Sequence, residues 1–137
     1  MIGTLIAKNA VRRGFDSVMR GDVEALRSIF HKDASLIYPT RGEITGREAI
    51  LEFYRQFLDV FPRVRAVLHV AAVEKLFDWV GTNALVTCFE VHTTNRQGVT
   101  FTQEGMQLIR LQRGKIMQMR YFFADTVALA DAWKASL

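Results

Sequence analysis

Hydrophobic and polar positions alternate most regularly near the C-terminal end of the chain. Thr102–Leu111 and Ile116–Phe123 both read as strands rich in β-branched and aromatic residues, and the turn Gln112–Lys115 between them contains Gly114. Glycine is favoured in tight hairpin turns because they require a positive φ. The pattern therefore predicts a long β-hairpin, which is stable only within a larger sheet that helices cover.

The N-terminal part of the chain has the spacing of two helices. Residues 4–20 carry hydrophobic side chains at intervals of three, four and seven, which is typical of an amphipathic helix. Gly21 ends this helix. Asp22 is a suitable N-cap for a short second helix because its carboxylate can accept hydrogen bonds from free backbone N–H groups.

A third helix, Arg47–Phe61, has the most regular pattern, and its apolar face consists mainly of aromatic rings. Thr45 is expected to cap this helix, with Glu48 completing a capping box, and Pro62 ends it. The residues of the apolar face are Ile50, Phe53, Tyr54, Phe57 and Phe61.

Further strands are predicted on both sides of the third helix. Asp33–Tyr38 precedes that helix, Val67–Phe77 and Ala84–Thr93 follow it, and Thr126–Trp133 is a predicted C-terminal helix. Helices and strands are segregated, and the last four strands form an antiparallel meander, so the fold class is α+β. The length of 137 residues fits a single domain over residues 1–137.

Composition and charge exclude several classes of protein. Hydrophobic residues make up 50% and charged residues 23% of the chain, and no apolar run approaches the roughly 18 residues of a membrane helix. The apolar stretch Met1–Ala7 precedes basic residues, which is the reverse of a secretory signal, so the protein is predicted to be cytoplasmic. The net charge of +4 is spread along the chain, which argues against a nucleic-acid partner.

No metal or cofactor is expected from the sequence. A single cysteine, Cys88, excludes an internal disulfide. The histidines and acidic residues lack the spacing of zinc or iron ligands, and there is no glycine-rich phosphate loop.

Several short motifs occur in the order found in a known superfamily. Their order and spacing resemble the nuclear transport factor 2 and ketosteroid isomerase superfamily, in its polyketide-cyclase-like (SnoaL-like) branch. The motifs are Gly21-Asp22, Lys32-Asp33-Ala34, Tyr38-Pro39, Gly46-Arg47-Glu48-Ala49-Ile50, and Arg113-Gly114-Lys115-Ile116 with Asp125 behind the following strand.

The resemblance implies a cone-shaped, cystatin-like α+β barrel. In this fold a strongly curved mixed or antiparallel sheet wraps around the third helix, and the first helix closes it. The mouth of the cone is the expected ligand site, and homodimers are expected through the outer face of the sheet. The fold hosts many unrelated functions, so it does not specify a reaction.

The positions that correspond to the catalytic residues of the steroid isomerases are all changed. The resemblance places Tyr38 where those enzymes have a carboxylate base, Gly14 where they have a tyrosine, and Gln107 where they have a second acid. A phenol with a pKa near 10 is a poor base at neutral pH but a good hydrogen-bond donor. The isomerase mechanism is therefore not expected, whereas Tyr38 and Gln107 remain candidate donors.

Two further candidates follow from other members of the superfamily. Tyr121 corresponds to the pocket carboxylate of the epoxide hydrolases and would again be a donor. Asp125 is either an acid or base at the rim of the pocket or the N-cap of the C-terminal helix, and the second interpretation is favoured.

The register of the final hairpin decides between Glu104 and Gln107. A two-residue turn places Glu104 on the same face as Met119 and Tyr121, whereas a three-residue bulged turn places Gln107 there. The resemblance favours Gln107. A buried Glu104 would have a raised pKa and would be a candidate acid or base.

Two histidines have possible roles. His69 is either a base inside the cone, with a pKa near 6.5, or a half-buried strand residue, and the second is favoured. His92 and Glu90 share one strand face and are expected to pair on the outside of the sheet.

The expected pocket is lined by rings and thioethers and suits a hydrophobic molecule with one or two oxygens. One hypothesis is an enzyme of the isomerase, cyclase or hydrolase type, acting by proton transfer on a carbonyl or epoxide compound. The alternative is a non-catalytic ligand-binding or dimeric interaction module. The expected ligand-binding residues are Phe15, Phe53, Tyr54, Phe57, Met117, Met119 and Phe123.

Overall fold

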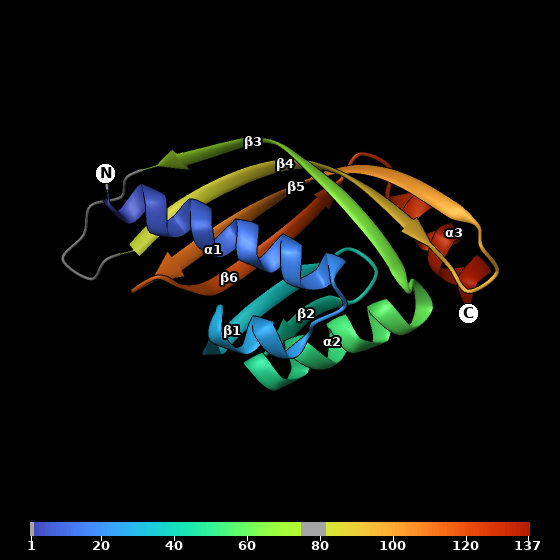
Figure 1. The fold of residues 1–137 in the computed structure, drawn as a ribbon, viewed down its shortest axis with the longest axis horizontal. Helices are drawn as coiled ribbons and strands as arrows, with labels where there is room; N and C mark the ends of the chain where they lie inside the picture. Colours follow the sequence, from blue (N-terminus) through green and yellow to red (C-terminus); the bar gives the residue numbers. More distant parts are fainter. Residues whose placement is uncertain (1, 75–81) are drawn as a thin grey trace.

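The protein is built on a six-stranded sheet (Figure 1). The structure, a computed structural model, describes residues 2–74 and 82–137, and the side chains of residues 8–68 and 84–137. The helices are α1 (Ile2–Met19), the 3-10 helix η1 (Glu24–Ser28), α2 (Arg47–Val60) and α3 (Thr126–Ser136). The strands are β1 (Phe30–Tyr38), β2 (Gly42–Thr45), β3 (Arg63–Glu74), β4 (Thr82–Thr94), β5 (Thr100–Gln112) and β6 (Lys115–Phe123).

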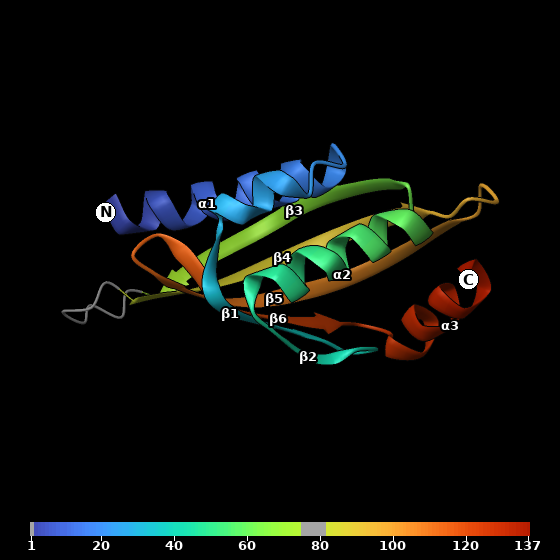
Figure 2. The same cartoon turned by 90° about the horizontal axis from the view of Figure 1, so that it is seen from below.

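The sheet is curved and mixed, in the order β2-β1-β6-β5-β4-β3. Strands β3 to β6 form the predicted antiparallel meander, and β1 pairs parallel to β6. Edge strands β2 and β3 do not pair with each other in the described residues, so the sheet stays open rather than closing into a full barrel. Helices α1 and α2 lie inside its curve, and α3 lies at one end (Figure 2). The predicted α+β class and cone-like sheet are confirmed.

The start of α2 differs from the predicted capping box. Thr45 is the last residue of β2, where it pairs with Ser35, so its side chain does not cap the helix. The N-cap is Gly46, whose φ of 91° is one that residues with a Cβ rarely adopt. Glu48 pairs with Arg27 of η1 instead. The N-cap of the second helix is Val23 rather than the predicted Asp22, although the Asp22 carboxylate still accepts from the Ala25 N–H at 3.2 Å.

A β-bulge in β6 changes which side chains face the concave side of the sheet. Ile116 lies opposite Leu111, but Gln118 lies opposite Arg110, so Met117 is an extra residue in β6. Ile116 and Met119 are therefore both buried on the concave side. The strict alternation that predicted Met117 in the pocket is broken, and that prediction was wrong.

The core fills the space between the concave face of the sheet and the helices. Gly105 of β5 allows one close contact there, since a Cβ at this position would lie 2.7 Å from Phe89 Cζ and 2.8 Å from the Phe122 carbonyl oxygen. The Phe89 ring can thus pack directly against the backbone of β5.

Among the described residues, no helix combines the length and apolar character that crossing a membrane requires.

Candidate functional site

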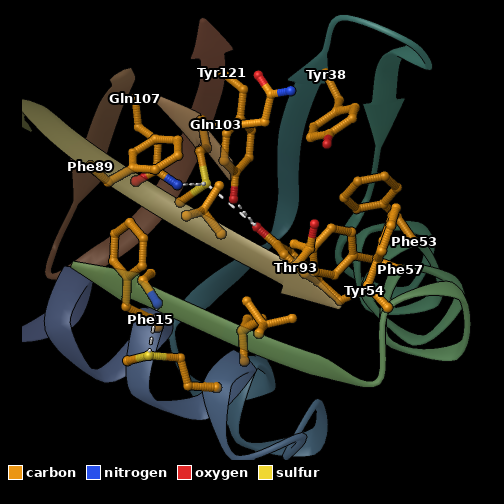
Figure 3. A pocket seen from close by; sticks show the side chains of 18 of the residues that line it. Phe15, Tyr38, Phe53, Tyr54, Phe57, Phe89, Thr93, Gln103, Gln107 and Tyr121 are labelled. Carbon is orange, nitrogen blue, oxygen red and sulfur yellow. Dashed lines mark hydrogen bonds between the residues drawn. The ribbon is translucent and has the colours of Figure 1, made fainter. Parts of the chain in front are cut away.

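A cavity of about 90 Å³ lies between the concave face of the sheet and the three α-helices (Figure 3). This volume exceeds the roughly 10–15 Å³ that one water needs. It is well below the roughly 300 Å³ at which pockets for drug-sized ligands begin. All three tyrosines of the chain line it. Its aromatic lining residues are Phe15, Phe30, Tyr38, Phe53, Tyr54, Phe57, Phe61, Phe89, Phe101, Tyr121, Phe123 and Trp133.

Two phenols from different elements meet inside this aromatic shell. The Tyr54 hydroxyl of α2 and the Tyr121 hydroxyl of β6 are 2.7 Å apart, and Figure 3 shows the two side chains pointing toward one another. The Tyr121 ring lies parallel to that of Phe123, with an interplanar angle of 4°. The Tyr54 ring packs edge-on against that of Phe53. These ring contacts restrict where the hydroxyls can lie.

A glutamine amide completes the polar end of the cavity. Gln107 of β5 lies directly opposite Tyr121 in the sheet. The buried Thr87 hydroxyl donates to Gln107 Oε1 at 3.0 Å, and Gln107 Nε2 lies 3.6 Å from Met119 Sδ. The Tyr54 hydroxyl lies 3.7 Å from the same sulfur. The amide therefore turns its NH₂ group toward the cavity.

Tyr38 connects the cavity to α3. Its ring packs against Phe53 and Tyr121 with centroid separations of 4.9 and 5.3 Å, and its hydroxyl accepts a 3.4 Å hydrogen bond from Trp133 Nε1. The end of α3 is also attached to the β4–β5 turn, because Asn95 Nδ2 donates to Ser136 Oγ at 3.1 Å. Two polar contacts thus hold α3 beside the cavity.

The three phenols are neutral at physiological pH. Burial raises the pKa of Tyr54 well above its usual range, and the neighbouring Tyr121 adds to this effect. Burial likewise raises the pKa of Tyr38 and of Tyr121, although the Tyr54 hydroxyl acts in the opposite direction on Tyr121. The tyrosines therefore serve as hydrogen-bond donors and acceptors, not as bases.

Apart from the tyrosines, no ionisable side chain lines the cavity within the part of the chain that the structure describes. Glu104 is exposed on the outer face of β5, so it is not a buried acid or base. Asp125 is exposed and accepts from the Ala128 N–H at 2.9 Å, which makes it the N-cap of α3. The side chain of His69 lies outside the described residues. His92 and Glu90 pair at 2.6 Å, away from the cavity lining.

The structure brings most of the sequence-predicted site residues together. Gln107 lies inside and Glu104 outside, as the resemblance favoured, but the turn is not the three-residue one that was linked to this arrangement: Gln112 pairs with Lys115 across the two-residue turn Arg113-Gly114, and the bulge at Met117 shifts the register instead. The predicted residues that line the cavity are Phe15, Tyr38, Phe53, Tyr54, Phe57, Gln107, Met119, Tyr121 and Phe123. No group of three His, Cys, Asp or Glu side chains in the described ranges is placed to hold a metal.

Several lining residues were not foreseen. Phe89 and Thr93 line the cavity from β4, Gln103 from β5 and Trp133 from α3, while Thr87 orients Gln107. The β4 residues follow from strand alternation once Glu90 and His92 are assigned to the outer face. Trp133 carries no such signal, because its contact depends on how α3 folds back.

The curved mixed sheet, with helices inside its curve and a cavity at the centre, is the fold of solved nuclear transport factor 2-like proteins. The chain belongs to the SnoaL-like domain family, whose model matches residues 11–119. No curated protein matches the sequence significantly.

Solved structures of the same fold span nearly the whole chain. Bal32a from a soil-derived mobile gene cassette is 23% identical, with a TM-score of 0.79, and the match covers 96% of this chain and 98% of that one. A nuclear transport factor 2-like superfamily protein from Salmonella enterica is 18% identical, with a TM-score of 0.78 and coverage of 92% and 93%. An LEH-like epoxide hydrolase from Mycobacterium tuberculosis is 13% identical, with a TM-score of 0.74 and coverage of 96% and 92%. At these identities the likeness shows the fold alone.

Proposed function

We propose that this protein binds a small hydrophobic molecule carrying a hydrogen-bond-accepting oxygen, such as a carbonyl or epoxide, in the cavity between the helices and the concave sheet. The observation that carries the proposal is the Tyr54–Tyr121 pair, with its 2.7 Å hydrogen bond, in a cavity whose other lining residues are mostly aromatic and aliphatic. Since only one proton of the pair is used between the two oxygens, the other can be donated to a ligand. The small volume favours a slender molecule or one that displaces side chains.

Binding without proton abstraction fits the described lining best. The donors Tyr54, Tyr121 and Gln107 are neutral, and no carboxylate, imidazole, amine or thiol lines the cavity in the described residues. A positioned general base contributes roughly 10²–10⁴ to a rate, so a cavity without one supports binding more directly than proton transfer.

An isomerase, cyclase or hydrolase activity is the second candidate. It is supported by the tyrosine pair, since neutral phenols can polarise a carbonyl or an epoxide oxygen. The name of the Mycobacterium tuberculosis structure adds an epoxide hydrolase to the chemistries found on this fold. Under this candidate, the ligand leaves the protein chemically changed.

We also propose a homodimer through the outer face of the sheet. This face exposes large apolar side chains on neighbouring strands: Met106 of β5 and Phe122 of β6 are each 44% exposed and lie opposite each other. Exposed apolar side chains that gather on one face are typical of a contact surface.

The function is tested by adding small apolar ketones, epoxides and hydrocarbons to the purified protein and measuring its melting temperature. A bound ligand stabilises the fold by mass action, by about 2.7 kcal/mol at 100 times its Kd. We expect the melting temperature to rise to a plateau with at least one oxygen-bearing compound. Mass spectrometry of the compound extracted afterwards should show that it is chemically unchanged. Recovery of a product would favour the enzyme. No shift with any compound would contradict both candidates.

A further inference from the structure

Met119 occupies the point in the cavity where two hydrogen-bond donors from different elements converge. The Tyr54 hydroxyl of α2 and Gln107 Nε2 of β5 lie 3.7 and 3.6 Å from its sulfur. A thioether accepts hydrogen bonds only weakly and has no proton to donate. Both donors therefore have a poor partner in Met119, and a ligand oxygen would be a better one.

The orientation of the Gln107 amide is set by Thr87, a residue that does not line the cavity. Thr87 is fully buried, and its hydroxyl donates to Gln107 Oε1 at 3.0 Å. If the amide were flipped, its oxygen would face the sulfur, which offers no proton. The end of the amide that faces the cavity is therefore the NH₂ group, and together with the tyrosine pair it offers donors to a ligand.

The Met119 side chain is suited to moving aside. Methionine has three rotatable bonds and fills irregular gaps in protein interiors. At about 90 Å³ the cavity is small for a ring compound, and its volume would increase if Met119 took another rotamer. The same movement would free Tyr54 and Gln107 for a new partner.

We propose that the Met119 thioether is a displaceable substitute for the ligand's oxygen. A ligand with an acceptor-only oxygen, such as a ketone, takes the position of the sulfur between Tyr54 and Gln107 and turns the Met119 side chain away. The inference rests on the proposed binding function and specifies which side chain moves and which two donors then hold the oxygen. A ligand hydroxyl fits this position less well than a ketone, because its own proton would face the Tyr54 hydroxyl and the Gln107 NH₂ group, which are themselves donors.

The test compares acetophenone with ethylbenzene, which has nearly the same shape but lacks the oxygen. Both are titrated by calorimetry into the wild type, Met119→Leu and the control Met106→Leu, which makes the same change on the outer face. Leucine nearly preserves the volume but removes the acceptor. Because one hydrogen-bond partner is worth roughly 1 kcal/mol, we expect Met119→Leu to bind acetophenone about fivefold to tenfold more tightly. Ethylbenzene should change less than about twofold by the same reasoning.

A second measurement uses the wild type, so it does not depend on how the variant folds. With isotope-labelled methionine methyl groups, the Met119 resonance should move at saturating acetophenone, while that of Met106 stays in place. An unmoved Met119 resonance at saturation, or an equal gain for both probes in Met119→Leu, would overturn the inference and leave the binding function intact. If neither probe binds any of the proteins, both are overturned.

Discussion

Tyr54 and Tyr121 share one hydrogen bond of 2.7 Å within a shell of rings, so one hydroxyl proton is used inside the pair and the other is free to be donated. Burial raises the pKa of both groups, which keeps that proton on the phenol. The residues at the centre of the cavity can therefore hold an oxygen or polarise it, while proton abstraction would need a different group.

Removing single hydroxyls should separate binding from stability. We expect Tyr121→Phe to weaken the binding of an oxygen-bearing ligand about fivefold to tenfold, because the Tyr54 hydroxyl that donates to the ligand loses the 2.7 Å hydrogen bond that orients it, which is worth roughly 1 kcal/mol. Tyr38→Phe should also weaken binding, with little loss of stability, since its hydroxyl makes a hydrogen bond as long as 3.4 Å. Calorimetric titration and urea unfolding measure the two effects. A large drop in melting temperature for either variant would show that the hydroxyl serves the core instead.

The raised pKa values predict a particular dependence on alkaline pH. Unfolded tyrosines ionise near pH 10. In the folded chain burial favours the neutral form of Tyr38, Tyr54 and Tyr121. Their contribution to stability is therefore fully present below about pH 9. It is lost above about pH 10, by up to roughly 1.4 kcal/mol per pH unit for each group, as the unfolded chain releases protons.

Tyrosinate absorbance in the ultraviolet measures this directly. All three tyrosines line the cavity, so the whole signal reports on this site. In concentrated urea the absorbance should rise near pH 10, whereas in the native protein it should rise only with unfolding. Tyr54→Phe should make the fall in unfolding free energy above pH 10 less steep. If the tyrosines of the folded protein ionised near pH 10 without unfolding, the conclusion that the phenols are buried and neutral would be contradicted.

At the scale of elements, the sequence predicted strands and helices well where their hydrophobic spacing is regular. The ring-bearing face of α2 and the hairpin of β5 and β6 are of this kind. The errors fall where a local irregularity overrides periodicity. Met117 does not lie on the pocket face because of the bulge in β6. Thr45 lies at the end of β2 and does not cap α2.

The candidate site was predicted less completely than the fold. The cavity-facing positions of Tyr54 and Tyr121 follow from alternation and helix spacing. The orientation of Gln107 required the hairpin register and the Thr87 contact, which lies across two strands. Pairings between distant segments of this kind have no local signal, which is why Trp133 was also missed.

Asp125 allows a test of capping against catalysis. As the N-cap of α3 it accepts from the Ala128 N–H, so Asp125→Ala should lower the unfolding free energy by about 0.5–2 kcal/mol. Asp125→Asn keeps a capping oxygen and should be close to the wild type. Ligand affinity should be unchanged in the asparagine variant. If Asp125→Asn lost as much binding or turnover as Asp125→Ala, the carboxylate would act at the site.

At the scale of the whole molecule, the open sheet has two faces of different character. The concave face forms the core and the cavity, whereas the outer face exposes apolar side chains such as Met106, Phe122 and Val67. A surface of this kind fits the proposed homodimer, because association would remove these side chains from water.

A charge on the outer face should disrupt that association. We expect Phe122→Lys to weaken the homodimer about tenfold, since a lysine buried in the proposed contact loses its hydration. Val127→Lys is the matched control, because Val127 is 70% exposed on α3. Light scattering over a range of protein concentrations gives the mass. A monomeric wild type, or an unchanged mass for Phe122→Lys, would contradict the dimer.

The extra residue in β6 has a consequence for how the length of this strand can change. Losing one residue from a regular strand turns every following side chain to the opposite face. At Met117 the reverse holds, because excising it would leave Ile116, Gln118 and Met119 in plain alternation with their present neighbours across β5. Descendants of this chain, natural or designed, can therefore tolerate a shorter β6 at this one codon while Tyr121 still points inward.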